Sequence, residues 1–173
     1  MRTFISLELP EEIRKEIIQI QKKIPEFSGR KTEPENLHLT LKFLGEISEQ
    51  EVEKIKARLR EIKLKKFQAE ISELGVFNPN FVKIIWLKIN GCDELQKIID
   101  NKLENLFPKE KRFMSHLTIA RVKKINDKDK FISKLKNIKI KNLKFPVSSF
   151  FLKKSTLTSE KPVYETIEEF NLI

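Results

Sequence analysis

The chain of 173 residues contains only two histidines, and each begins the same kind of four-residue motif. The sequence reads His-Leu-Thr-Leu from residue 38 and His-Leu-Thr-Ile from residue 116. In a β-strand the side chains of residues i and i+2 point to the same face. The spacing therefore predicts two polar strand faces, one presenting His38 beside Thr40 and the other presenting His116 beside Thr118.

Two imidazoles on opposite sides of one substrate can divide acid–base catalysis between them. A neutral imidazole removes a proton from the attacking oxygen, and a protonated one gives a proton to the leaving oxygen. Histidine suits both roles because its reference pKa, about 6.5, leaves both forms populated near neutral pH. Threonine hydroxyls donate hydrogen bonds to the non-bridging oxygens of a phosphate. These residue types predict phosphodiester cleavage by His38 and His116, with Thr40 and Thr118 holding the phosphate.

Two basic residues near the motifs are candidate ligands for the same phosphate. Strand alternation places Lys42 on the face of His38, where it would add a positive charge. The alternative for Lys42 is an ordinary lysine at the end of a strand. Alternation places Arg121 on the face opposite to His116, so Arg121 would need a bend or a β-bulge to reach the site.

The sequence argues against several other kinds of catalytic site. A metal site needs three or four ligands, and no carboxylate lies two or four residues from either histidine. The single cysteine, Cys92, excludes an internal disulfide and a cysteine-based zinc site. With four glycines in all, the chain has no glycine-rich phosphate loop and no serine-hydrolase elbow. We expect chemistry without a metal or another cofactor.

The composition indicates a basic protein, with 35 Lys and Arg against 25 Asp and Glu and a net charge of +10. This balance favours a polyanionic partner such as nucleic acid. The alternative is a solvated surface in a heat-adapted protein, because the lysines are scattered along the chain. The first apolar stretch is too short for a signal sequence or a membrane span. We expect one cytoplasmic domain over residues 1–173, acting as a monomer without a membrane partner.

Hydrophobic periodicity predicts alternating strands and helices along the chain. Phe4 falls on the polar side of the first strand, and the stretch 26–35 is predicted to be a loop. Ser48 with Glu51 forms a capping-box pattern, and Asn126 is the predicted cap of the last helix. The predicted strands are 2–9, 36–45, 67–77, 81–89, 115–122 and the region from 145 to 170, and the predicted helices are 10–25, 48–63, 93–107 and 126–136.

The two motifs lie 116 − 38 = 78 residues apart, each in a half that mixes helices with strands. This spacing indicates a weak internal duplication within an α+β fold. Two lobes related by a pseudo-twofold axis would bring the motifs face to face.

Several stretches resemble the RNA 2′,3′-cyclic phosphodiesterases, historically called 2′-5′ RNA ligases, of the two-histidine phosphoesterase superfamily. The similar blocks are residues 1–5, 36–45 and 116–122, with weaker similarity over 82–87 and 162–170. One departure is that Glu160-Lys161-Pro162 replaces the glycine that is usual in the family before the aromatic residue of the closing strand.

The resemblance implies a bilobal fold in which two antiparallel sheets face a central cleft and the helices lie outside. It implies hydrolysis of a 2′,3′-cyclic phosphate at an RNA end to a 2′-phosphate. By residue, His38 would give a proton to the departing 3′ oxygen, and His116 would be the base that activates water. Thr40 and Thr118 would hold the phosphate.

Several alternatives remain open at this point. Phe4 would either stack on a base at the RNA terminus or pack in the core, whereas Trp86 is expected in the core. The substrate would be an RNA end, including those of tRNA fragments, or a small cyclic nucleotide. The same chemistry in reverse would join RNA ends through a 2′-5′ bond. A protein that binds RNA ends without cleaving them is the third hypothesis.

Overall fold

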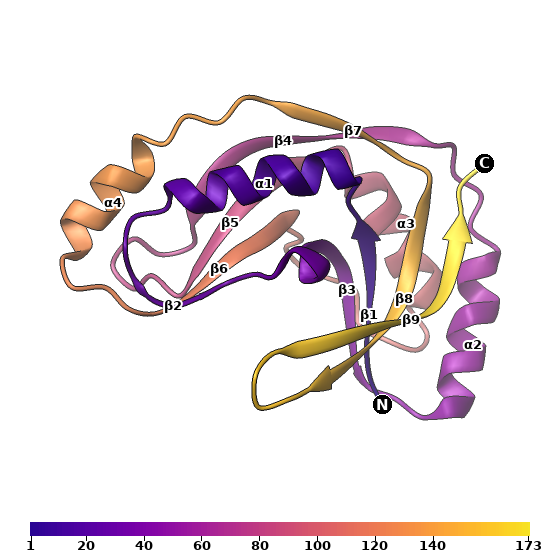
Figure 1. Cartoon of the computed structure of the whole chain (residues 1–173). Helices are drawn as coiled ribbons and strands as arrows, with labels where there is room; N and C mark the ends of the chain where they lie inside the picture. The colour runs from indigo at the N-terminus through magenta and orange to yellow at the C-terminus, as the bar shows by residue number, and fades with distance from the viewer.

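Two antiparallel sheets and four α-helices make up the computed structural model, which describes residues 1–173 (Figure 1). The strands are β1 (Arg2–Glu8), β2 (Ser28–Lys31), β3 (His38–Glu46), β4 (Phe67–Val76), β5 (Ile84–Asn90), β6 (His116–Lys124), β7 (Leu143–Val147), β8 (Ser149–Leu157) and β9 (Pro162–Asn171). The helices are α1 (Glu11–Lys23), α2 (Glu49–Arg60), α3 (Asp93–Leu103) and α4 (Lys128–Lys136). The α+β class with two antiparallel sheets is as predicted.

The two sheets repeat one arrangement of strands. One sheet has the order β3-β1-β8-β9, and the other has the order β6-β5-β4-β7 with β2 added beside β6. In each sheet the strand with the histidine motif pairs with a strand that leads into a helix, β1 into α1 and β5 into α3. Helices α2 and α4 follow the two motif strands and lie at opposite ends of the molecule (Figure 1).

The repeat extends to the pairing of single residues. His38 lies opposite Glu8, and His116 lies opposite Lys88. The pairing then shifts by one residue at the same place in each sheet, between Ile5 and Ser6 and between Ile85 and Trp86. The duplication inferred from the motifs is therefore built into the backbone.

These shifts are β-bulges in which the motif strand carries one extra residue, Leu41 in β3 and Ile119 in β6. A bulge interrupts the alternation of faces, so that two successive residues point the same way. Both strands accordingly bury the two residues that follow the threonine and expose the third. The buried pairs are Leu41 with Lys42 and Ile119 with Ala120, and the exposed residues are Phe43 and Arg121.

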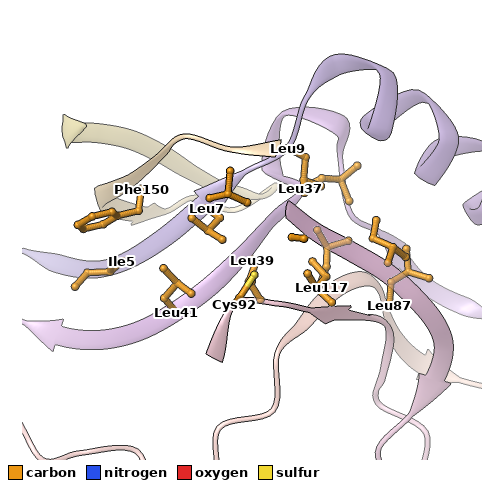
Figure 2. Close-up of a cluster of buried hydrophobic side chains, with 14 of the residues drawn as sticks. Ile5, Leu7, Leu9, Leu37, Leu39, Leu41, Leu87, Cys92, Leu117 and Phe150 are labelled. Carbon is orange, nitrogen blue, oxygen red and sulfur yellow. The ribbon is translucent and has the colours of Figure 1, made fainter. Parts of the chain in front are cut away.

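Apolar residues of the two motif strands belong to one continuous hydrophobic core. Figure 2 shows Leu39 and Leu41 of β3 near Leu117 of β6, with Cys92 close to them. All of these side chains are at most 1% exposed. Burial of each leucine contributes about 1.5–3 kcal/mol, so the leucines on one face of the strands fix the direction of the polar face.

Residues 26–35, predicted to be a loop, contain the short strand β2 and the start of a 3₁₀ turn over Pro34–Asn36. The loop prediction is therefore wrong for residues 28–31. Hydrophobic periodicity missed this strand because β2 contains no apolar residues. Strand β2 forms by pairing with β6, and a side chain at Gly29 would come within 2.2 Å of the Arg121 carbonyl oxygen. The close approach of β2 to β6 requires the glycine.

The helix ends differ slightly from the predictions. Helix α3 ends at Leu103 rather than at residue 107. The cap of α4 is Asp127, which accepts a hydrogen bond from the Lys130 amide, rather than Asn126. The capping box of Ser48 and Glu51 is confirmed.

Lys42 is buried and forms an ion pair with Asp100 of α3, with 2.5 Å between Nζ and Oδ1. Lys42 also donates to the Pro108 carbonyl, and Asp100 accepts from the Gln96 amide and from the Glu110 backbone amide. Burial opposes ionisation of Asp100, but these hydrogen bonds outweigh it and lower the pKa of the carboxyl. The ion pair and its hydrogen bonds therefore connect β3 to α3 and to the loop before β6.

We expect the variant Lys42→Met to lose about 3–5 kcal/mol of unfolding free energy, because it leaves the Asp100 carboxylate buried without its cation. The double variant Lys42→Met with Asp100→Leu should recover most of this loss. Urea denaturation measures both, with Lys139→Met on the exposed surface as control. A loss below about 1 kcal/mol in the single variant would show that the pair does not hold the loop.

Candidate active site

The two histidine motifs line one cleft of about 960 Å³ between the sheets. Strands β3 and β6 lie in contact with each other, and each contributes its imidazole and its hydroxyl to the cleft wall. The structure therefore brings together His38, Thr40, His116 and Thr118, the four residues that the spacing placed on polar strand faces.

The two imidazole rings are oriented in the same way. Nδ1 of His38 lies 2.7 Å from the Asn36 carbonyl oxygen, and Nδ1 of His116 lies 2.8 Å from the Met114 carbonyl oxygen. Because a carbonyl oxygen only accepts, Nδ1 carries the proton in both rings. Nε2 is then the nitrogen that can gain or lose a proton. For His38, Nε2 lies 3.0 Å from the Thr40 hydroxyl.

An aromatic ring packs edge-on against each imidazole, but the two surroundings differ. Tyr164 lies 5.1 Å from His38 at 85°, and Phe77 lies 5.0 Å from His116 at 87°. A second ring, Phe4, also packs 5.0 Å from His38 and is only 3% exposed. Phe77, in contrast, is 51% exposed. His38 thus packs in a cluster with two aromatic rings, which also contact each other, whereas the ring beside His116 is open to solvent.

Burial lowers the pKa of His38 to about 4. The hydrogen bond to the Asn36 carbonyl and the charge of Glu8 act in the opposite direction. The positive charges of Lys153 and Arg121 lower the pKa further. His38 is therefore neutral at pH 7 in the free protein.

The prediction that Lys42 adds a free cation to the polar face is wrong. Lys42 borders the cleft, but the bulge at Leu41 leaves its side chain buried, and Asp100 neutralises its charge. The same kind of bulge, at Ile119, supplies the bend that Arg121 needed to reach the site. Arg121 lines the cleft and has no carboxylate within 4.0 Å, so it is a free cation beside the second motif.

Of the two alternatives for Phe4, the structure favours packing: Phe4 borders the cleft but is only 3% exposed, and its ring packs against His38 and Tyr164. Two rings that line the cleft are exposed, Phe77 beside His116 and Phe43, which is 66% exposed. Simple alternation assigned Phe43 to the leucine face. A signal was present, because Phe43 and Arg121 share one offset from the histidines, 43 − 38 = 5 and 121 − 116 = 5.

Three polar residues that the sequence analysis missed hold the backbone around the motifs. The Gln21 amide donates to the carbonyl of Ile119, the bulge residue, at 2.9 Å. The Thr32 hydroxyl donates to the Thr118 carbonyl at 2.9 Å, and the Asn36 amide donates to the Pro162 carbonyl at 3.0 Å. These bonds connect α1, the residue after β2 and the turn before β3 to backbone carbonyl groups of β6 and β9.

Two further features bear on the kind of site. No three His, Cys, Asp or Glu side chains come together in a way that could hold a metal ion. None of the helices is long and apolar enough to cross a lipid bilayer.

Trp86 is 7% exposed, which confirms its predicted place in the core.

Comparison with known proteins finds similarity over nearly the whole chain. Residues 7–86 and 89–164 match the family of LigT-like phosphoesterases. A protein of Methanocaldococcus jannaschii is 38% identical over 98% of this chain and 100% of its own length. One of Archaeoglobus fulgidus is 33% identical over 98% of this chain and 99% of its own. Both are named RNA 2′,3′-cyclic phosphodiesterase.

Solved structures show the same fold. The crystal structure of TT0787 of Thermus thermophilus has a TM-score of 0.83 and 29% identity, over 99% of this chain and 97% of that one. Escherichia coli LigT, in a complex with 3′-AMP, has a TM-score of 0.80 and 23% identity, over 99% and 97% of the two chains. On this similarity of sequence and fold, the chain belongs to the LigT-like phosphoesterase family.

Proposed function

We propose that the protein is an RNA 2′,3′-cyclic phosphodiesterase, which opens the cyclic phosphate at an RNA end to a 2′-phosphate. The observation that carries the proposal is the presence of two imidazoles in one cleft, each with Nδ1 held by a backbone carbonyl and Nε2 left for proton transfer. The relatives in M. jannaschii and A. fulgidus, which bear this name, match the chain over nearly its whole length.

In the proposed reaction a water molecule attacks the phosphorus atom from the side of His116. Nε2 of neutral His116 takes the proton of the water, while the bond from phosphorus to the 3′ oxygen breaks. Nε2 of protonated His38 gives its proton to the departing 3′ oxygen, which leaves a 3′ hydroxyl and a 2′-phosphate. The hydroxyls of Thr40 and Thr118 donate to the non-bridging oxygens, and Arg121 stabilises their negative charge.

The low pKa of His38 in the free protein requires that this ring gains a proton when the substrate binds. The bound phosphate carries a negative charge, and a negative charge close to an imidazole favours the protonated form. In the proposed mechanism, the charge of the bound phosphate therefore causes the protonation of His38, which then acts as the acid.

The proposal includes metal-independent catalysis by a cytoplasmic monomer. RNA ends, including those of tRNA fragments, and small cyclic nucleotides all carry the phosphate that the motifs would recognise. Joining of ends through a 2′-5′ bond would use a 5′ hydroxyl in place of water as the attacking group, with the same departure of the 3′ oxygen, and would be the reverse of cleavage of a 2′-5′ bond. We expect hydrolysis to dominate because water is far more concentrated than any RNA end.

The variants His38→Ala and His116→Ala should each lower kcat for an RNA ending in a 2′,3′-cyclic phosphate by about 10²–10⁴-fold. The wild-type protein should keep its full rate with a chelator present. Analysis of the product by chromatography distinguishes the 2′-phosphate from the 3′-phosphate. Undiminished turnover in both variants would exclude the mechanism, and RNA binding without any turnover by the wild type would favour a binding protein.

In an NMR titration of the free protein, the His38 ring should change its protonation state at about pH 4. The ring is protonated below this pH and neutral above it. Addition of adenosine 2′-monophosphate, a product analogue, should move the midpoint upward because of the phosphate charge. The variant His116→Ala assigns the signal. A midpoint that stays in place would remove His38 as the proton donor.

The variant Phe43→Ala should raise KM for the RNA substrate by about tenfold, since stacking of a base on an aromatic ring contributes about 1–3 kcal/mol. Phe81→Ala is the matched control, because Phe81 is 63% exposed but does not line the cleft. Equal KM values for the two variants would show that no base stacks on Phe43.

A further inference from the structure

Three of the arginines that line the cleft, Arg2, Arg112 and Arg121, have no carboxylate partner within 4.0 Å. The fourth, Arg30, lies 3.8 Å from Glu33 and donates to the Glu160 carbonyl. Arg121 follows the second motif and accounts for the charge of the reacting phosphate. Arg2 and Arg112 therefore remain without a role in the reaction.

Arg2 lies further along the cleft wall than the reacting phosphate. It lies in register with Glu46 at the end of β3, and only 6 − 2 = 4 residues of β1 separate it from Ser6, the partner of Thr40, because β3 carries two extra residues between these pairs. A strand rises about 3.3 Å per residue, so the backbone of Arg2 lies roughly 13 Å along the strand from the threonine. Glu46 is exposed and lies 3.3 Å from the amino-terminal nitrogen, which offsets its charge.

Arg112 reaches the same end of the cleft from the opposite lobe. The loop that precedes β6 is tied to the buried ion pair, because the Pro108 carbonyl accepts from Lys42 and the Glu110 amide donates to Asp100. Lys42 directly precedes Phe43 in β3, so the loop is anchored next to the stretch of β3 that carries Phe43, and Arg112 and Phe43 both line the cleft. One arginine from each lobe thus borders this end.

We propose that Arg2 and Arg112 form a second anion subsite, which binds the internucleotide phosphate on the 5′ side of the terminal nucleotide. This inference rests on the proposed function and specifies its substrate class, an RNA chain rather than a cyclic mononucleotide. Two unpaired guanidinium groups next to an exposed ring match a chain that alternates phosphates with bases. A cyclic mononucleotide has no phosphate that reaches this end.

The test compares a 2′,3′-cyclic mononucleotide with a trinucleotide that ends in the same cyclic phosphate. In Arg2→Ala and in Arg112→Ala, kcat/KM for the trinucleotide should fall about tenfold through KM, a loss of about 1.4 kcal/mol of binding. Turnover of the mononucleotide should stay within about twofold of the wild type. Lys111→Ala, a neighbouring exposed lysine outside the cleft, is the control.

Salt dependence gives a second readout. Loss of one phosphate contact to a single strand should reduce the slope of log(kcat/KM) against log salt by about 0.7 for the trinucleotide. Arg112→Lys, which keeps the charge, should keep the slope. Thermal melting of each variant confirms that it folds.

An equal loss on both substrates would place the arginines at the reacting phosphate and overturn the subsite. Unchanged kinetics on the trinucleotide in both variants would overturn it as well. In either case turnover of the mononucleotide by the wild type would leave the proposed function standing. If the wild type turns over neither substrate, the proposed function itself fails, and the subsite fails with it.

Discussion

One extra residue directly after the motif threonine in each motif strand determines what faces the cleft. Without the bulges at Leu41 and Ile119, strict alternation would direct Lys42 to the cleft and would bury Phe43 and Arg121. Before each bulge, the histidine and the threonine share the polar face. After the bulge, the next residue on this face is the third after the threonine, not the second. The leucines on the other side of the strands make this arrangement rigid, because any slip in register would expose the core.

The two halves share a backbone but give their histidines different surroundings. Both imidazoles are fixed through Nδ1 in the same way, so the difference comes from the neighbours of the rings. Phe4 and Tyr164 enclose His38, whereas the exposed Phe77 covers only one side of His116. A duplicated scaffold therefore supplies matched geometry, and side chains outside the motifs provide the chemical asymmetry that an acid and a base require.

The sequence predicted what depends on local periodicity. The strands of both motifs, the capping box of Ser48 and the convergence of His38 with His116 all follow from spacing along the chain. The directions in which the side chains of Lys42 and Phe43 point do not follow from this spacing, because a bulge depends on pairing with a distant strand. Strand β2 escaped prediction for the same reason, since the only strand that pairs with it is β6. The burial of Phe4 likewise arises from rings contributed by other strands.

The enclosure of His38 has a thermodynamic consequence for binding. A ring that is neutral in the empty cleft and protonated beside a phosphate takes up a proton from solution with every substrate molecule. Linkage then requires the affinity for the phosphate to decrease as the pH rises. In the proposed mechanism, the heat of binding therefore depends on the ionisation enthalpy of the buffer, and the cleft acts as a site for two ligands, an anion and a proton.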